Sequence, residues 1–352
     1  MDLPAHTMST TMTEPSPPLA HDAQPVEALL QAARDVAERL QRRLQAAIVG
    51  RDAVIELVVV ALLADGHVLL EDYPGSGKTT LARVLGESIE PEPGSSVAPF
   101  RRIQFTPDLV PSDITGTTVL DLATHALVFR RGPLFAHVVL ADEINRTSPK
   151  VQSALLEAMA EKQVTVDEQT HALDELFHVI ATQNPLDVAG TYPLPSPQLD
   201  RFLFKIVMEP IGREDELRVV SRYPATSLEL AAGLGRVRRA ELLQARATLR
   251  EHVVVAPVIR ESLVDLVRAL RADARLLRGP STRALVVALP ALAARALLHG
   301  RDFVAPEDVV ALARPLLAHR LEPATADADL GAIVGEHVAR AAEGLARHSL
   351  RP

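Results

Sequence analysis

The chain has 352 residues, of which 47% are hydrophobic and only 3% are aromatic, and it contains no cysteine. The missing cysteines exclude disulfides, thiolate catalysis and cysteine-based metal sites. Its 37 basic and 45 acidic side chains give a formal net charge of −8, which provides no general attraction to nucleic acid or anionic lipid. The length allows about two domains with an aliphatic core.

The first 25 residues are rich in Thr, Ser, Pro and His and show no hydrophobic periodicity. This composition predicts a disordered tail over residues 1–25. The tail has no apolar segment of the kind that a secretory signal requires. The most apolar run of the chain, Val54 to Leu63, is too short to cross a bilayer. We therefore expect a cytoplasmic protein with no direct membrane insertion.

From residue 26 to about 210, helical and strand periodicities alternate. Helices are predicted at 26–47, 52–64, 78–87 and 148–161, and strands at 67–71, 100–104, 136–141 and 176–182. Two inserted hairpins are predicted, one pairing 118–121 with 126–130 and one pairing 163–167 with 169–173. The alternation predicts an α/β nucleotide-binding domain over 26–210, with a parallel sheet covered by helices on both faces. Beyond it the strands are predicted to stop, and residues 211–352 form a smaller all-helical domain.

A phosphate-binding loop is predicted where the strand at 67–71 turns into the helix at 78–87. The connecting residues are Pro74, Gly75, Ser76, Gly77, Lys78, Thr79 and Thr80. Glycines let backbone N–H groups surround a phosphate, and the helix N-terminus adds positive potential. Lys78 would reach the β- and γ-phosphates of ATP, and the Thr79 hydroxyl would ligate Mg²⁺. Asp72 stands where the general pattern has glycine, so an ordinary glycine-containing turn is the alternative.

An acidic pair, Asp142 and Glu143, follows the apolar strand at 136–141. Ligands of open α/β sheets bind at the carboxyl edge of the strands. There Asp142 would bind Mg²⁺ through water, and Glu143 would orient and polarise the attacking water. The alternative is a helix N-cap followed by a solvated glutamate. Together with Lys78, the pair predicts an ATP-hydrolysing site.

Two further polar residues are candidates for the same site. Asn184 ends a strand before a proline, and it could hydrogen-bond the γ-phosphate or the attacking water; the alternative is an Asn-Pro turn. Arg201 lies beside an apolar cluster, and an arginine supplied by a neighbouring subunit would neutralise charge during phosphoryl transfer. The alternative for Arg201 is a surface ion pair with Asp200.

Three blocks of sequence closely resemble the MoxR family of AAA+ ATPases. They are FTPDLVPSDITG at 105–116, LADEINR at 140–146, and the segment 181–202 with ATQNP, GTYPLP and QLDRF. The resemblance extends from about residue 48 to 317. It implies an AAA+ core with a helical lid, ATP and Mg²⁺ as cofactors, and a homo-oligomeric ring, expected to be a hexamer.

The resemblance also implies a role for each candidate residue. The Walker motifs are matched by Lys78, Thr79, Asp142 and Glu143, and the first sensor is matched by Asn184. Arg201 matches the arginine finger that acts on a neighbouring subunit, and Arg283 matches the second sensor. The segment that packs on adenine is matched by Val49 and Gly50. Arg283 would reach the γ-phosphate from the lid and close the lid on ATP. The missing glycine at Asp72 is a family trait, because relatives often have Glu-Asp at this place.

The family is thought to act as chaperones that remodel client proteins. Their partners carry a von Willebrand factor A domain, and the outcome is enzyme maturation or metal-cofactor insertion. The two hairpins would face the pore of the ring and contact the client. The alternatives are the motor subunit of a metal chelatase, a nucleic-acid remodelling ATPase and a non-enzymatic nucleotide switch. Nucleic acid is disfavoured because the hairpin at 164–171 carries Asp167 and Glu168 but no Lys or Arg.

Overall fold

The computed structural model describes residues 25–71, 76–184, 190–325 and 327–349. The predicted tail at 1–25 therefore lies almost wholly outside the described residues. So do Asp72, Pro74 and Gly75 of the predicted phosphate-binding loop. In the described part of the chain, no helix is long and apolar enough to cross a membrane.

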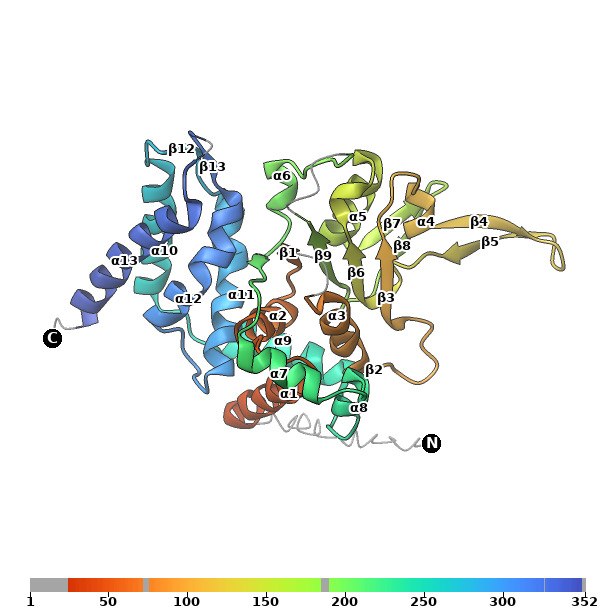
Figure 1. The fold of residues 1–352 in the computed structure, drawn as a ribbon, viewed down its shortest axis with the longest axis horizontal. Helices are drawn as coiled ribbons and strands as arrows, with labels where there is room; N and C mark the ends of the chain where they lie inside the picture. Colours follow the sequence, from red (N-terminus) through yellow and green to blue (C-terminus); the bar gives the residue numbers. More distant parts are fainter. Residues whose placement is uncertain (1–24, 72–75, 185–189, 326, 350–352) are drawn as a thin grey trace, which may run out of the picture.

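A five-stranded parallel sheet forms the centre of the larger part of the molecule, in the order β10-β1-β9-β6-β3 (Figure 1). Its strands are β1 (Val68–Glu71), β3 (Ala98–Gln104), β6 (Ala136–Asp142), β9 (His178–Gln183) and β10 (Phe204–Val207). The predicted parallel α/β core is confirmed. All seven residues of β6 are buried, as expected for an apolar strand with a neighbour on each side.

Helices cover both faces of the sheet because side chains alternate between faces along each strand. On one face Leu70 and Ile180 belong to the core that includes α1 (Val26–Ala47), α2 (Asp52–Leu63) and α3 (Lys78–Glu87). On the other face, residues such as Leu69 and Val179 pack in a second core with α5 (Pro149–Glu161). These four helices have the predicted bounds to within one residue.

Both predicted hairpins are present. One pairs β4 (Gly116–Asp121) with β5 (Ala126–Arg131), follows the short helix α4 (Pro111–Thr115), and projects away from the sheet (Figure 1). The other pairs β7 (Gln163–Val166) with β8 (Gln169–Ala172). Its turn residues, Asp167 and Glu168, both have positive φ, at 48° and 63°, which is the backbone that a two-residue hairpin turn requires even without glycine. The rings of Phe129 and His171 stack at 3.8 Å, so the two hairpins touch.

Helices dominate the chain beyond residue 210. They are α7 (Arg213–Ser221), α8 (Ser227–Ala232), α9 (Arg239–His252), α10 (Pro257–Arg271), α11 (Thr282–Leu298), α12 (Pro306–Leu317) and α13 (Leu330–Ser349). The last four form a bundle at the left of Figure 1. The prediction that strands stop at residue 210 is wrong in detail. Three short strands occur there: β11 (Val237–Arg238), which pairs with β2 (Ile89–Glu90), and the mutual pair β12 (Leu276–Arg278) and β13 (Glu322–Pro323).

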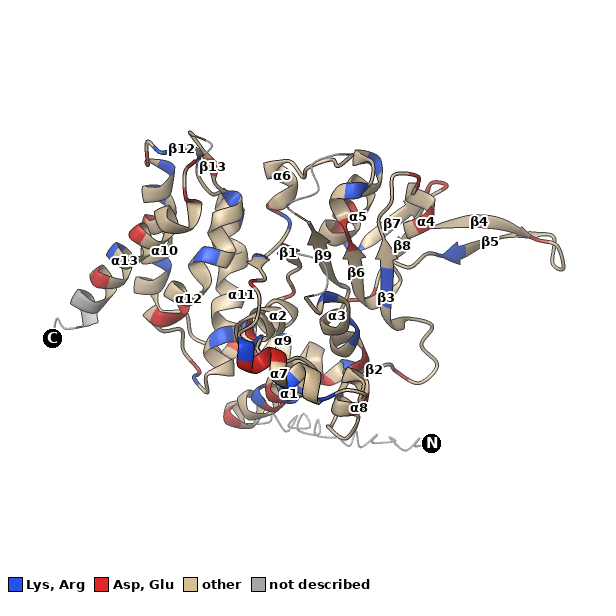
Figure 2. Cartoon of the chain, viewed as in Figure 1, with Lys and Arg blue, Asp and Glu red and all other residues tan. Residues whose placement is uncertain are grey.

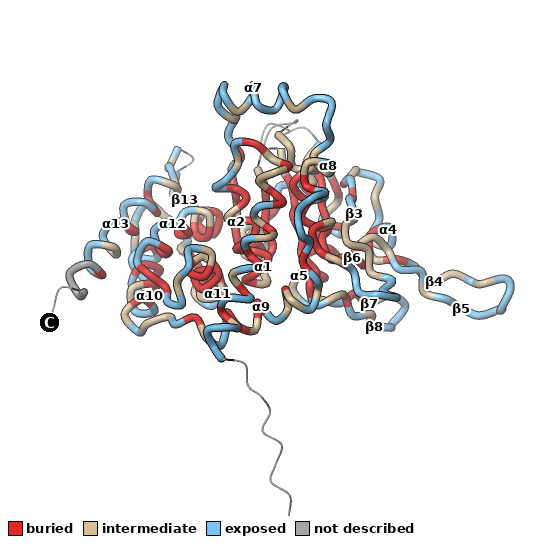
Figure 3. The backbone as a smooth tube through the Cα atoms, turned by 90° about the horizontal axis from the view of Figure 1, so that it is seen from below, coloured by how far each residue is buried: buried red, intermediate tan, exposed pale blue. Residues whose placement is uncertain are grey.

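The helices α8 and α9 are tied to the α/β core. Arg43 of α1 is buried and donates hydrogen bonds to Ser88 and to the carbonyl of Ala231 in α8, and α9 packs along α1. By contrast, α7 has no buried residue, and the β4–β5 hairpin is largely exposed (Figure 3). A domain boundary near residue 210 stays a prediction.

Candidate nucleotide site

The carboxyl end of β1 leads toward α3, which begins at Lys78. Gly77 precedes it with φ of 93°, a left-handed conformation that only glycine adopts at little cost. Among the described residues other than its own chain neighbours, none has an atom within 4 Å of the position that a Cβ on Gly77 would take, so the backbone angle is what requires glycine. The first turn of α3 presents backbone N–H groups and the positive end of the helix dipole, which together suit a phosphate.

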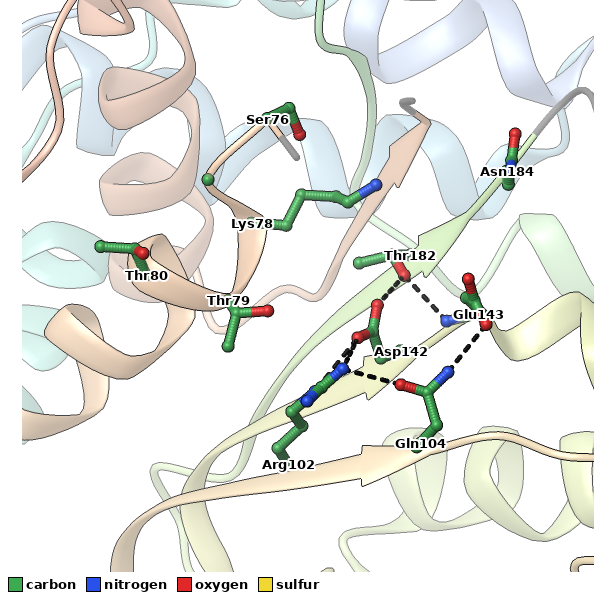
Figure 4. A pocket seen from close by; sticks show the side chains of 11 residues that line it. Ser76, Lys78, Thr79, Thr80, Arg102, Gln104, Asp142, Glu143, Thr182 and Asn184 are labelled. Carbon is green, nitrogen blue, oxygen red and sulfur yellow. Dashed lines mark hydrogen bonds and ion pairs between the residues drawn. The ribbon is translucent and has the colours of Figure 1, made fainter. Parts of the chain in front are cut away.

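A cavity of about 380 Å³ opens in front of this helix N-terminus. We call it the Lys78 pocket; it is lined by Ser76, Gly77, Lys78, Thr79, Thr80, Arg102, Gln104, Asp142, Glu143, Thr182 and Asn184. Figure 4 shows their side chains converging from α3 and from the ends of β3, β6 and β9. The structure thus brings together the described part of the predicted loop, the acidic pair and Asn184.

Asp142 and Glu143 are held by one hydroxyl group. Thr182 on the neighbouring strand β9 donates from Oγ1 to Asp142 Oδ1 at 2.7 Å and accepts the backbone N–H of Glu143 at 2.8 Å. Glu143 has φ of 58°, so the chain turns sharply at the end of β6. A 3₁₀ turn follows at Ile144–Arg146, and Glu143, at its N-cap, makes no side-chain cap. Asp142 and Glu143 thus line the pocket together, and neither side chain caps this turn.

Arg102, Gln104 and Thr182 are pocket residues that sequence reasoning missed. Arg102 donates to Asp142 Oδ2 from Nη2 at 2.7 Å and from Nε at 3.1 Å. The Nε2 of Gln104 donates to Glu143 Oε2 at 2.8 Å. The sequence could have indicated these residues, because Gln104 and Thr182 lie at or next to the carboxyl ends of strands. Arg102 lies two residues before Gln104 and therefore faces the same side of β3.

The described donor set fits a magnesium ion. Asp142 supplies a carboxylate, and Thr79 supplies a hydroxyl that points toward it across the pocket (Figure 4). Mg²⁺ prefers oxygen ligands, keeps several of its waters and takes few protein groups. Lys78 and the helix N-terminus on the same side would hold phosphate oxygens that complete its coordination.

A second cavity, of about 710 Å³, adjoins the Lys78 pocket and shares Ser76, Gly77 and Thr80 with it. Its other lining residues are mostly apolar: Ala47, Ile48, Val49, Arg51, Pro210, Ile211, Glu216, Val219, Val220 and Ser227. Val49, which belongs to the predicted adenine-packing segment, therefore lines a mostly apolar cavity next to the Lys78 pocket. Gly50 follows with φ of 68°, and a Cβ there would lie 2.5 Å from Asp215 Oδ2. Glycine is thus required by both its backbone angle and the close approach of α7.

Arg201 and Arg283 do not line the Lys78 pocket. They line a different cavity, of about 270 Å³, which we call the arginine pocket. Its other lining residues are Ala64, Asp65, Gly66, His67, Met159, Ala160, Lys162, Asp200, Leu203, Val286, Val287, Pro290 and Arg320. Ala64–His67 precede β1 and Leu203 precedes β10, so this cavity lies at the amino edge of the sheet. Arg283 therefore does not line the pocket in which the family resemblance implies that it reaches its own chain's γ-phosphate.

The alternative for Arg201, an ion pair with Asp200, is not what the structure contains. Arg201 donates to the carbonyl oxygen of Leu156. Asp200 instead accepts from Arg320 at 2.7 Å and from the Ser281 hydroxyl at 3.1 Å. Arg320 and Ser281 both belong to the helical region, so that region is fastened to the residue next to Arg201.

Comparison with known proteins places this architecture in a class. Residues 67–204 match the family described as "ATPase family associated with various cellular activities (AAA)", and residues 268–348 match the AAA lid domain. A crystal structure of a proposed ATPase from Cytophaga hutchinsonii superposes with a TM-score of 0.80 at 34% identity, covering 89% of this chain and 96% of that one. The parallel core and the helical lid are therefore those of an AAA ATPase.

Curated relatives define the family more narrowly. YeaC of Bacillus subtilis, an uncharacterized protein, is 44% identical over 78% of this chain and 82% of its own length. Chaperone MoxR1 of Mycobacterium tuberculosis is 39% identical over 86% and 80%, and Protein MoxR of Methylorubrum extorquens is 32% identical over 85% and 92%. The chain belongs to the MoxR family of AAA ATPases.

Proposed function

We propose that this protein hydrolyses ATP to ADP and phosphate with Mg²⁺ as cofactor. The observation that carries the proposal is the meeting of Lys78, Asp142 and Glu143 in one pocket, at the edge of the sheet where α/β proteins bind nucleotides. Phosphoryl transfer requires positioning and charge stabilisation rather than covalent chemistry. The Lys78 pocket offers a cation, a metal-binding carboxylate and a second carboxylate for water.

Several residues of the pocket have a part in this reaction. The N-terminus of α3 and Lys78 bind and orient the phosphates, and the adjoining apolar cavity at Val49 accepts the base. When bound, Mg²⁺ neutralises charge on the β- and γ-phosphate oxygens. Glu143, whose backbone is fixed by Thr182, orients a water molecule for in-line attack and accepts its proton. Asn184 hydrogen-bonds the γ-phosphate or this water from the end of β9.

The arginine pocket supports a ring assembly, for which we propose six subunits. Arg201 and Arg283 lie at the amino edge of the sheet, whereas Asp142 lies at the carboxyl edge, separated by at least the length of β1, about 13 Å. In a head-to-tail ring each subunit presents one surface to the next subunit's opposite surface. We propose that Arg201 and Arg283 both act on the ATP of a neighbouring subunit. Arg283 then senses the neighbour's nucleotide rather than closing its own lid.

We further propose that hydrolysis drives the remodelling of a client protein. A relative is named Chaperone MoxR1, and the β4–β5 and β7–β8 hairpins touch each other through Phe129 and His171, so a movement of one is passed to the other. Lys and Arg are interspersed with Asp and Glu over the chain (Figure 2), and the β7–β8 hairpin has neither Lys nor Arg. This disfavours nucleic acid as the client. A von Willebrand factor A domain protein remains the proposed partner, with a client enzyme or cofactor-insertion target.

The test of hydrolysis is the variant Glu143→Gln. Loss of the water-orienting carboxylate should lower turnover by about 10²- to 10³-fold, while a fluorescent ATP analogue should still bind with wild-type affinity. Glu157→Gln, an exposed position on α5, is the matched control and should leave turnover unchanged. Wild-type turnover in the Glu143→Gln variant would refute the assignment.

The same variant tests the client. Held in its ATP-bound form, Glu143→Gln protein should retain a von Willebrand A-domain protein and its target on affinity capture from the native host. Capture of nucleic acid or of a chelatase subunit instead would overturn the chaperone proposal in favour of that activity.

A further inference from the structure

The carboxylate proposed to hold magnesium is already paired with a cation of the same chain. Arg102 directs Nε and Nη2 at one oxygen of Asp142, Oδ2, at 3.1 and 2.7 Å. Such a charge-assisted pair of hydrogen bonds is among the stronger side-chain contacts in proteins. The side chain of Asp142 is 12% exposed and that of Arg102 is 47% exposed, so the pair is partly shielded from solvent while Arg102 can still move.

The acceptor capacity of Asp142 is nearly used up in this arrangement. An ionised carboxylate has about four acceptor positions on its two oxygens. Two on Oδ2 face Arg102, and one on Oδ1 accepts the Thr182 hydroxyl at 2.7 Å. A metal ion held by Asp142, directly or through water, needs acceptor positions on the side that faces Thr79 and Lys78. Arg102 lines that same pocket, so its guanidinium occupies acceptor positions of Oδ2 that such a metal ion could use.

Arg102 also connects the two acidic residues of the site. Besides Asp142, its Nη2 donates to Gln104 Oε1 at 2.8 Å, and Gln104 Nε2 donates to Glu143 Oε2 at 2.8 Å. These bonds form an unbroken path from the metal-binding carboxylate to the water-orienting one (Figure 4). A movement of the guanidinium away from Asp142 therefore also changes what holds Gln104, and through it Glu143.

We propose that Arg102 is a positioning residue that competes with Mg²⁺ for Asp142 and links metal binding to the orientation of Glu143. The inference rests on the proposed function, because it takes the Lys78 pocket to be the site of Mg²⁺ and ATP. With Mg²⁺ at the site, Asp142 would hold the ion, directly or through water, and Arg102 would turn toward solvent, keeping or shifting its bond to Gln104. Arg102 thereby weakens metal binding at the site and makes the arrangement of Glu143 depend on the metal.

The experiment measures the affinity of a fluorescent, non-hydrolysable ATP analogue in excess Mg²⁺ and in excess EDTA. Arg102→Gln removes the competing charge, so binding in Mg²⁺ should tighten by about two- to fivefold, the range for one partly exposed ion pair, with no tightening in EDTA. Arg102→Lys keeps the charge without the two-pronged contact and should tighten binding to a smaller extent. Arg101→Gln is the matched control, because it makes the same charge change on the opposite side of β3 and should behave as wild type.

The outcomes separate this inference from the proposed function. A wild-type chain that binds the analogue in neither condition overturns the proposed function, and the inference with it. If wild-type protein binds but Arg102→Gln binds no more tightly in Mg²⁺, competition is refuted and the nucleotide site stands. Weaker binding of Arg102→Gln in both conditions, with Arg101→Gln unaffected, would instead show that Arg102 contacts phosphate, which also contradicts the proposal.

Discussion

The Lys78 pocket and the arginine pocket lie at opposite edges of the same sheet and have complementary contents. The first gathers two carboxylates and a lysine at the carboxyl ends of β3, β6 and β9. The second gathers Arg201, Arg283 and Arg320 at the amino ends of β1 and β10. The two cavities share no lining residue. A single chain thus carries a pocket with Lys78, Asp142 and Glu143 at one edge of its sheet and a pocket with Arg201, Arg283 and Arg320 at the opposite edge.

The two pockets are also built differently. The Lys78 pocket combines the start of α3 with the carboxyl ends of the adjacent strands β3, β6 and β9, whose relative positions are fixed by backbone hydrogen bonds. The arginine pocket joins the α/β core to the helical lid, and Arg320 and Ser281 of the lid region clamp Asp200 next to Arg201. We infer that a change in the position of the lid changes the position of Arg201. The predictions below test this division, from the largest effect to the smallest.

Arg201→Ala should lower turnover about 10³-fold, the lower end of the range for a transferred arginine finger. Its own Lys78 pocket is intact, so nucleotide affinity should stay within about twofold of wild type. Steady-state phosphate release and binding of a fluorescent analogue give the two numbers. A large loss of affinity would place Arg201 in its own chain's site and break the comparison.

Acidification should destabilise the fold beneath the arginine pocket. Burial lowers the pKa of His67 to about 4, and it lowers the pKa of the neighbouring His178 well below its usual value. The neutral His67 ring donates to the carbonyl of Met159 and accepts the N–H of Val179, so a second proton would break the latter bond. A histidine in the unfolded chain has a pKa near 6.5, so below that pH the unfolded state binds more protons than the folded state. The contribution of neutral His67 to stability is therefore complete above about pH 6.5 and is lost as the pH falls. Between pH 6.5 and 4 the free energy of unfolding should fall by about 3 kcal/mol from His67 alone.

Urea unfolding across this pH range measures the effect. His67→Gln should flatten the acid dependence, whereas His125→Asn, an exposed position at the tip of the β4–β5 hairpin, should not. Parallel curves for wild type and His67→Gln would show that the buried ring is not the source.

Lys78→Ala should weaken ATP binding by about two orders of magnitude, because it removes a charged donor to the phosphates. Arg201 should remain able to serve a neighbour in this variant, since it lies at the other edge of the sheet. Isothermal titration with ATP checks the affinity, and Lys150→Ala, an exposed lysine on α5, is the control. Retained affinity would remove Lys78 from the phosphate site.

Asp200→Asn should lower turnover about tenfold while leaving nucleotide affinity unchanged. The variant keeps an acceptor for Ser281 but weakens the pair with Arg320, so the segment that carries Arg201 loses part of its support. Asp265→Asn, on exposed α10 surface, is the control. Unchanged turnover would mean that the lid contact does not position Arg201.

Much of the fold and of the Lys78 pocket was predictable because local signals agree there. A glycine before Lys-Thr and an apolar strand before it fix the start of α3, and the bounds of α1 and α3 follow from periodicity alone. The strand β10 was not identified, because four residues with a central lysine, Lys205, carry too little pattern. Lys205 forms an ion pair with Glu71 of β1, and this contact exists only because the two strands are paired.

The remaining features depend on contacts between distant parts of the chain. Arg102 meets Asp142 because the register of β3 on β6 sets Gln104 beside Asp142, and sequence alone does not give that register. The gathering of Arg201 with Arg283 depends on how the lid docks on the core. The family resemblance implied that Arg201 acts on the ATP of a neighbouring subunit and that Arg283 closes the lid on the ATP of its own chain, so it did not indicate that the two arginines line one pocket.

The measurement that tests the central claim most directly mixes two inactive variants, Lys78→Ala and Arg201→Ala, in equal amounts. If the two pockets of different subunits combine, a randomly assembled head-to-tail ring contains intact composite sites at about a quarter of its interfaces. Turnover should then recover to about a quarter of the wild-type value. Turnover no higher than that of the separate variants, in rings shown to exchange subunits, would contradict a site shared between neighbours.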